Sequence, residues 1–416
     1  PAFLVSNIRE MFPKMEIRQC GDMQEPMELL ELPGISLDYF LRGLAGEAYQ
    51  DNAVFQELYS WYLQSPEYRI LVKKLTEASF SERPSDKIGK TVAKILYGEI
   101  SPYSATRLER FAACAFAHFL QYGLKVTERA EYEFRVMDMG NVMHMALEKF
   151  AVEVRKEGLD WAELTEEERN RIIDSCLDQV SADYGNTVLK SSARNEYMLE
   201  RTRRILRRTV WALQEQLKHG AFRPEGFEVR FQGGRIDRVD IMEEPENNRV
   251  YVKVIDYKTG NTSFDLLALY HGLQLQLMVY LDGALQVEKR KYPDREIVPA
   301  GVFYYNVKDP MIQEKIHADM ESINEQMLKK MKMNGLVQAD DNMSTKIDST
   351  MASIPVSLNR DGSFSKRSSV ASRKQFDVLG AYVRRKICDI RESILDGNAA
   401  VEPYELGKKN ACTYCP

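Results

Sequence analysis

Two short apolar runs that carry carboxylates, separated by a polar turn, constrain the fold of this chain more than any other feature. The first is Gly234-Arg-Ile-Asp-Arg-Val-Asp240 and the second is Val254-Ile-Asp-Tyr-Lys258. Between them, Glu243-Glu-Pro-Glu-Asn-Asn248 contains the proline and asparagine residues typical of turns. The β-branched residues favour strands. The pattern therefore predicts an antiparallel hairpin or meander that brings Asp237 beside Asp256.

The second predicted strand places a carboxylate and an ammonium group on one face. Side chains alternate along a strand, so Asp256 and Lys258 lie on the same side. With Asp237 beside them, they suit a hard divalent cation such as Mg²⁺, which takes oxygen ligands. The lysine could orient or help to deprotonate an attacking water and offset phosphate charge. The alternative is a surface hairpin whose charges are solvated.

A histidine and an acidic residue share one face of a helix that precedes these strands. His144 and Glu148 are four residues apart in the predicted helix 141–156. A neutral imidazole can bind a metal, although a histidine on an apolar helix more often has a structural role. Glu148 could support the histidine or contact a metal through water. Glu228, in the alternating segment 227–231, is expected near the same site.

Four ordered motifs together resemble those of the RecB-type PD-(D/E)XK nuclease family. They are Gly140-Asn-Val-Met-His144-Met-Ala-Leu-Glu148, the two strand segments above, the second of which continues as Thr259-Gly260, and Gln276-Leu-Met-Val-Tyr280. The chain is similar to the C-terminal nuclease region of AddB-type helicase–nuclease subunits. The resemblance implies an α/β fold in which residues 101–416 form a restriction-endonuclease-like core, a small mixed sheet flanked by helices. Residues 1–100, whose apolar spacing predicts packed helices, would be a helical N-terminal extension from the end of the helicase-like region.

The resemblance also implies which residues hold the metal. His144, Asp237, Asp256 and the carbonyl oxygen of Tyr257 would be ligands of Mg²⁺, or of Mn²⁺ in its place. Lys258 would position the attacking water or stabilise charge in the transition state.

Gln276 and Tyr280 match a further motif of the family. They lie four residues apart, and so on one face, of the predicted helix 269–285. In the family pattern they would hydrogen-bond the DNA backbone or order the catalytic lysine. The alternative is that they cap polar groups in an ordinary core.

Three of the six cysteines have a pattern that suits a metal cluster. Cys412 and Cys415 form a Cys-x-x-Cys pair, and thiolates at that spacing ligate iron–sulfur clusters or zinc. Cys114, in the predicted helix 107–122, resembles the upstream cluster cysteine of the family, with Ala115 in place of the usual proline. The resemblance implies that these cysteines bind a 4Fe-4S cluster that clasps the two ends of the domain. We expect a fourth cysteine just after the last residue, so the cluster would be incomplete in this truncated chain.

Composition and charge limit the classes of function. At 416 residues with 44% hydrophobic content, the chain can bury a sizeable core. Its formal net charge of −5 excludes a basic coat over the whole surface, so DNA would contact a local groove. No Gly-x-x-x-x-Gly-Lys-Ser/Thr loop occurs, so no ATPase centre is visible. No apolar run approaches the roughly 18 residues of a membrane span, and the chain begins at Pro1, so we expect a fragment of a soluble, cytoplasmic protein.

Together, these features predict a Mg²⁺-dependent deoxyribonuclease that hydrolyses phosphodiester bonds of DNA, and the resemblance implies an exonuclease that acts on single-stranded DNA. The resemblance implies that it works as a heterodimer with an AddA partner, whose ATP-driven motor serves double-strand-break repair by recombination. The alternative is a catalytically silent module that binds DNA ends or acts as a scaffold of the same complex; the complete set of predicted ligands and the lysine argues against it. A zinc protein built on the Cys-x-x-Cys pair is weaker, because two adjacent thiolates and one distant thiolate are too few.

Overall fold

The structure is a computed structural model that describes most of the chain. The described residues are 7–8, 10–14, 32–44, 53–80, 86–98, 105–127, 136–184, 192–231, 234–312, 320–340, 342–406, 409–413 and 415. The chain divides into two compact units, Pro1–Ser85 and Asp86–Pro416. The sequence pattern predicts a boundary at residue 100, but α5 (Lys90–Tyr97) belongs to the second unit because it packs against α15 (Arg373–Leu395). Within the described ranges, no helix has the length and apolar character needed to cross a membrane.

Among the residues described in the first unit, three short helices pack their apolar faces together. They are α2 (Pro33–Leu44), α3 (Ala53–Gln64) and α4 (Arg69–Ser79). Phe40, Tyr62 and Val72 form the buried centre of this cluster, and the Tyr62 hydroxyl donates a hydrogen bond to the carbonyl oxygen of Pro33 (2.6 Å). The predicted helical character of this region is confirmed for the residues that the structure describes.

The second unit is built on a mixed sheet, whose described strands follow the order β1-β2-β3-β4-β5-β6. The strands are β1 (Arg223–Phe231), β2 (Gly234–Glu244), β3 (Arg249–Lys258), β4 (Glu296–Asn306), β5 (Asn334–Gln338) and β6 (Val370–Ala371). The β3–β4 and β5–β6 pairs are parallel and the other pairs are antiparallel. Two short strands in the C-terminal tail, β7 (Glu405–Leu406) and β8 (Lys409–Asn410), pair separately. The predicted small mixed sheet is confirmed.

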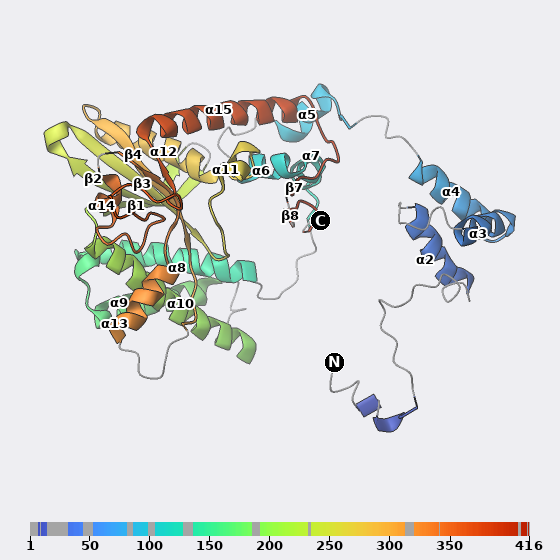
Figure 1. The fold of residues 1–416 in the computed structure, drawn as a ribbon, viewed down its shortest axis with the longest axis horizontal. Helices are drawn as coiled ribbons and strands as arrows, with labels where there is room; N and C mark the ends of the chain where they lie inside the picture. Colours follow the sequence, from blue (N-terminus) through green and yellow to red (C-terminus); the bar gives the residue numbers. More distant parts are fainter. Residues whose placement is uncertain are drawn as a thin grey trace. The chain divides into compact units, whose positions relative to one another are not determined.

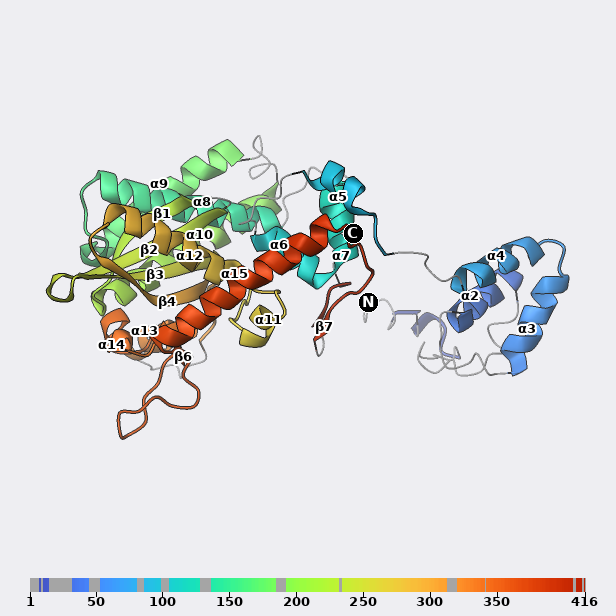
Figure 2. The same ribbon diagram turned by 90° about the horizontal axis from the view of Figure 1, so that it is seen from above.

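Helices cover both faces of this sheet (Figure 1). One face is covered by α8 (Val136–Lys156), α9 (Glu166–Asp183), α10 (Ala193–Lys218) and α13 (Met320–Lys330). The other face is covered by α12 (Gln276–Lys291) and by α15, which extends beyond the sheet to α5, α6 (Ala105–Ala113) and α7 (Ala115–His118) (Figure 2). Each interface holds a large apolar core, as expected for a sheet buried on both faces.

The β2–β3 hairpin forms as the sequence predicts. The antiparallel register runs from Glu244 opposite Arg249 to Arg238 opposite Ile255. Asp237 and Asp256 directly follow this last pair on their strands, and the Tyr257 N–H donates to Asp237 Oδ2. The turn is a 3₁₀ turn over Pro245–Asn247. The two carboxylates of the predicted site therefore lie together at the open end of the hairpin, away from the turn.

The predicted helix 107–122 is interrupted in the structure. It consists of α6 and α7, separated by Cys114, whose backbone is extended (φ −166°, ψ 118°). A π-helical turn, Phe119–Gly123, follows. Apolar periodicity does not reveal the break, because α6 and α7 both bury apolar side chains.

The predicted helix 269–285 is also two helices. The first, α11 (Leu266–Tyr270), ends before Gly272, which has φ +81°, and α12 begins at Gln276. A residue with positive φ cannot continue a right-handed helix. Gln274 stabilises the link, because its side chain accepts a hydrogen bond from the Asp265 N–H (2.9 Å) and donates one to the Ser263 carbonyl oxygen (2.9 Å).

A charged network lies buried within the β2–β3 hairpin. Arg238, Asp240 and Lys253 are 1%, 0% and 4% exposed. Asp240 pairs with Arg238 (Nε–Oδ1, 2.6 Å) and with Lys253 (Nζ–Oδ2, 2.9 Å), and the guanidinium lies over the rings of Trp161 and Phe227. Burial alone would raise the pKa of Asp240. The positive charges of Arg238 and then Lys253 outweigh this effect, so the pKa is lower than usual. The network therefore stabilises the fold only while all its charges are paired.

We predict that Asp240→Ala lowers the free energy of unfolding of the second unit by about 3–5 kcal/mol, because two buried cations lose their common partner. Urea denaturation followed by circular dichroism measures this change. Glu246→Ala, at an exposed position in the turn of the same hairpin, is the matched control and changes stability by less than about 0.5 kcal/mol. An Asp240→Ala protein as stable as wild type would contradict the prediction.

Candidate metal centre

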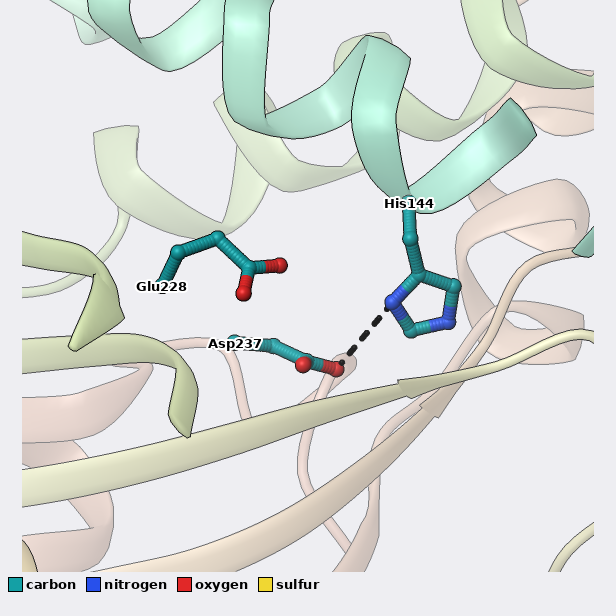
Figure 3. Close-up of side chains that lie close together, drawn as sticks. All are labelled: His144, Glu228 and Asp237. Atoms are coloured by element: carbon teal, nitrogen blue, oxygen red, sulfur yellow. Dashed lines mark ion pairs between the residues drawn. The ribbon is translucent and has the colours of Figure 1, made fainter. Parts of the chain in front are cut away.

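Side chains from three elements converge at the open end of the β2–β3 hairpin (Figure 3). His144 comes from α8, Glu228 from β1 and Asp237 from β2. One ligand atom of each lies within 4.8 Å of the other two, and no other such group occurs among the residues that the structure describes. His144 Nδ1 lies 3.4 Å from Asp237 Oδ2. An imidazole and two carboxylates at these distances form a donor set for a divalent metal ion.

His144 is held as a neutral imidazole. Burial of the ring, together with the positive charges of Lys258 and Arg235, lowers the pKa of His144 to about 4. A hydrogen bond to the backbone of Tyr257 opposes this shift. The Tyr257 ring lies edge-on to the imidazole, with 6.1 Å between the ring centroids. A neutral imidazole keeps a nitrogen lone pair that can bind a metal.

Gly140 allows α8 to approach the end of β3 closely. A Cβ atom at Gly140 would lie only 3.1 Å from Oγ1 of Thr259, the residue that follows β3. A side chain at Gly140 would therefore require Thr259 or α8 to shift by a few tenths of an ångström, about one helical turn before His144. The glycine of the motif is therefore explained by packing.

Glu228 reaches the site through an unusual backbone conformation. Its φ of +50° lies in the left-handed region, which few residues other than glycine adopt. Such strain persists only where the surrounding structure fixes it. The carboxylate pairs with Arg235, but burial outweighs this contact and raises the pKa of Glu228, with Glu148 adding to the shift. The expectation that Glu228 lies near the site is confirmed.

Asp237 and Asp256 carry negative charge that the protein neutralises only in part. Asp237 Oδ2 accepts a hydrogen bond from the Tyr257 N–H (2.7 Å). Burial, followed by the charge of Asp256, raises the pKa of Asp237 well above its ordinary value. Burial also raises the pKa of Asp256, against the opposing effect of Lys258. A bound cation would favour the charged form of both carboxylates.

The predicted lysine lies in a chain of contacts with the other predicted residues. Lys258 Nζ lies 2.6 Å from Asp256 Oδ2 and donates a hydrogen bond to Gln276 Oε1 (2.7 Å). Gln276 Nε2 in turn donates to the Tyr280 hydroxyl (2.7 Å). The ammonium group also lies 5.4 Å from the centre of the Tyr304 ring. Of the two roles that the resemblance implies for Gln276, these contacts fit the ordering of the lysine.

Glu109, on α6, contacts the candidate site but is not marked by any sequence motif. Glu109 Oε1 accepts hydrogen bonds from the N–H groups of Leu275 (2.6 Å) and Gln276 (2.9 Å) at the start of α12. Burial raises the pKa of Glu109 to about 7, although these hydrogen bonds and then Lys258 act in the opposite direction. No local pattern marks the residue, because its partners lie 166 and 167 positions further along the chain.

The three predicted cluster cysteines are not gathered into one ligand group. Cys114 is buried, whereas Cys412 and Cys415 are exposed. Among the described residues, their sulfur atoms do not form a group within 4.8 Å of one another. In this arrangement the three thiols do not fit an iron–sulfur cluster.

The C-terminal tail nevertheless lies against the Cys114 segment. The Tyr404 N–H donates to the carbonyl oxygen of Ala113 (2.9 Å), and the Phe116 N–H donates to that of Ala400 (3.0 Å). These bonds flank Cys114 on both sides. The start of the tail that leads to Cys412 and Cys415 therefore lies next to Cys114, although the three thiols are apart.

Known proteins resemble the chain over its whole length. Residues 102–416 match the PD-(D/E)XK nuclease superfamily. Three relatives are named as the same subunit of an ATP-dependent helicase/deoxyribonuclease. The chain is 38% identical over 436 residues to the protein of Lachnoclostridium phytofermentans, 33% over 445 residues to that of Alkaliphilus metalliredigens and 31% over 446 residues to that of Thermoanaerobacter sp. strain X514.

These matches cover all of this chain but only 37–38% of the relatives' own lengths. The match to the superfamily covers the part of the chain that forms the sheet, its flanking helices and the converging side chains. On this basis, the chain belongs to the PD-(D/E)XK nuclease superfamily.

Proposed function

We propose that this chain hydrolyses phosphodiester bonds of DNA with a divalent metal ion. The observation that carries the proposal is the convergence of His144, Glu228 and Asp237 beside the Asp256–Lys258 pair. Phosphodiester hydrolysis needs a cation near the phosphate and an activated water, and a metal donor set next to a lysine can provide both. The superfamily match supports the same chemistry.

Mg²⁺ or Mn²⁺ fits the donor set. Both ions take carboxylate oxygens, and an imidazole nitrogen is a ligand that transition metals accept readily. We propose His144, Glu228 and Asp237 as ligands, completed by Asp256 and the carbonyl oxygen of Tyr257. The raised pKa values of the two aspartates support a cation there, because the protein itself leaves their charge partly uncompensated. When bound, the ion would polarise the phosphate and lower the pKa of the attacking water.

Lys258 supplies a positive charge next to Asp256. An ammonium group held there offsets charge that develops on the phosphate, or holds the attacking water in place. Gln276 and Tyr280 restrict the direction of this ammonium group through consecutive hydrogen bonds. A side chain fixed before the reaction begins needs little reorganisation in the transition state.

We further propose that the substrate is single-stranded DNA, cleaved by exonuclease action within a helicase–nuclease complex. The names of the relatives, which include both helicase and deoxyribonuclease, support a complex of this kind. An AddA-type partner would supply the motor, and the complex would serve double-strand-break repair by recombination in the cytoplasm. Because the net charge of −5 excludes a basic coat over the whole surface, DNA would contact a local groove.

We also propose that Cys114, Cys412 and Cys415 belong to a 4Fe-4S site of the longer protein. The hydrogen bonds between the tail and the Cys114 segment support this proposal. Because the thiols are apart in the described structure, no step of the reaction is assigned to a cluster. Iron content and visible absorbance of the longer protein test the proposal, and a purified protein without iron after anaerobic preparation would contradict it.

We predict that Lys258→Ala and Asp256→Ala each slow cleavage of end-labelled single-stranded DNA by at least about 100-fold, the usual effect of removing a group that stabilises transition-state charge. Single-turnover cleavage in Mn²⁺ or Mg²⁺, without ATP, measures the effect.

Lys346→Ala is the matched control for Lys258→Ala. Like Lys258, Lys346 pairs with a carboxylate (Glu244) and lies over a tyrosine ring (Tyr251). The two lysine side chains are also exposed to nearly the same extent. It should cleave as wild type does. A wild-type protein that binds DNA without metal-dependent cleavage, alone and with its helicase partner, would favour the silent scaffold instead.

We predict that Asp237→Asn stabilises the metal-free protein by about 0.5–2 kcal/mol, the usual size of a stabilising substitution. The reason is that burial and Asp256 penalise the charged form of Asp237. The same substitution should remove most of the stabilisation that Mn²⁺ gives to wild type. Melting temperature with EDTA and with Mn²⁺ measures both effects.

The sign of the pH dependence follows from the raised pKa of Asp237. Between its ordinary and its raised value, the folded protein binds a proton that the unfolded chain does not. Metal-free wild type should therefore gain stability relative to Asp237→Asn as pH falls through the raised pKa toward the ordinary value of an aspartate. A stability difference that does not change with pH would contradict this account.

A further inference from the structure

We propose that Glu109 is a positioning residue of this site: it fixes the start of α12, and thereby the Gln276 side chain that directs Lys258 toward Asp256. The inference rests on the proposed nuclease function and adds a residue outside the predicted motifs. It is carried by an unbroken series of hydrogen bonds from α6 to the lysine.

The first step is the cap on α12. The first N–H groups of a helix lack partners within the helix, and Leu275, the N-cap residue of α12, provides no side-chain cap. Glu109 Oε1 accepts the N–H groups of Leu275 (2.6 Å) and Gln276 (2.9 Å) instead. A carboxylate at a helix N-terminus also interacts favourably with the helix dipole. The cap therefore comes from another helix and determines where α12 begins.

The second step leads from the cap to the lysine. Fixing the backbone of Gln276 fixes the origin of its side chain, whose Oε1 accepts from Lys258 Nζ (2.7 Å). The ammonium group can only donate, so the amide oxygen must face it. The amide nitrogen donates to Tyr280 (2.7 Å), whose ring packs edge-on against Phe231. Both ends of the amide are thus held, and a shift at the start of α12 would move the acceptor of the lysine.

The third step is the rigidity of α6 itself. Leu108 and Phe111 are buried in the core that also includes α12 and α15 side chains. Arg107 lies over the rings of Tyr97 and Tyr122. These contacts flank Glu109 on both sides in the sequence. A residue can position another only when its own support is rigid, and α6 meets this condition.

Glu109 acts through α12 rather than by direct contact with a metal. It is not part of the group formed by His144, Glu228 and Asp237, and both described hydrogen bonds of its Oε1 go to backbone N–H groups. The raised pKa of Glu109, on which Lys258 and Asp256 act in opposite directions, is consistent with its place next to their ion pair. Its removal should therefore impair cleavage and leave metal affinity unchanged.

The test compares Glu109→Gln, Glu109→Asp and Glu109→Ala in the full chain. Glutamine keeps an acceptor at the same reach, aspartate keeps the charge but is one methylene shorter, and alanine keeps neither. We expect single-turnover cleavage of single-stranded DNA in Mn²⁺ to stay near wild type for glutamine. The cleavage rate should fall for Glu109→Asp and fall by about tenfold for Glu109→Ala. Tenfold is the effect expected if the free energy of one lost helix cap is transmitted fully to the reaction. Mn²⁺ affinity, measured by calorimetry, should be unchanged in all three.

A double-mutant cycle separates positioning from general destabilisation. Gln276→Ala should slow cleavage in wild type but by less than about twofold in the Glu109→Ala protein, because both substitutions break the same series of contacts. Thr165→Ala is the matched control: it removes the side-chain cap of α9, on the opposite face of the sheet, and should lower the melting temperature without slowing cleavage.

Three outcomes overturn the inference. In the first, the rate losses of Glu109→Ala and Gln276→Ala multiply in the double mutant. In the second, Glu109→Gln cleaves as slowly as Glu109→Ala while Glu109→Asp stays active. In the third, all Glu109 variants cleave as fast as wild type. If Glu109→Ala does not fold, the glutamine and aspartate variants decide the question between acceptor reach and charge. A wild-type protein without cleavage overturns the proposed function and the inference together.

Discussion

The antiparallel register of β2 and β3 is the constraint on which the candidate site depends. It pairs Arg238 with Ile255, next to Asp237 and Asp256, and allows the Tyr257 N–H to donate a hydrogen bond to Asp237. Burial raises the pKa of both carboxyl groups, and the charge of Asp256 adds to the rise at Asp237. A slip of β3 by one residue would turn the Asp256 side chain to the opposite face of the sheet from Asp237. The fold thus concentrates negative charge at one point and leaves it for a cation to compensate.

Two carboxylates of the same strand have opposite environments. Asp240 is fully buried between two cations, and the pKa of its carboxyl group is lowered. Asp237, three residues earlier, faces a histidine and further carboxylates, and its pKa is raised. The first arrangement stabilises the folded chain by itself. The second destabilises the metal-free protein, which is typical of sites kept for function rather than stability. The strained backbone of Glu228 belongs to the same region.

The sequence predicts those parts of the structure that depend on neighbouring residues. The hairpin follows from β-branched runs around a turn and is confirmed. The helix that carries His144 is also found, but it begins at Val136 rather than at residue 141. Other parts depend on distant contacts. The cap that starts α12 comes from Glu109, 166 residues earlier than its first partner, so the break between α11 and α12 was not predictable from periodicity. The short strand β5 pairs with β4 and β6. Its five residues show no alternation of polar and apolar side chains that would predict a strand. The roles of the site residues stay predictions.

Diffraction from crystals soaked in Mn²⁺, recorded near the manganese absorption edge, tests the central claim most directly, because the metal reveals its own position. The account predicts an anomalous peak bonded to His144 and to the carboxylates of Asp237 and Glu228, at the open end of the hairpin. A well-ordered crystal with no peak there, or with manganese bound only elsewhere, would contradict the account. In that case the clustered carboxylates would not be a metal centre, and the proposed chemistry would lose its basis.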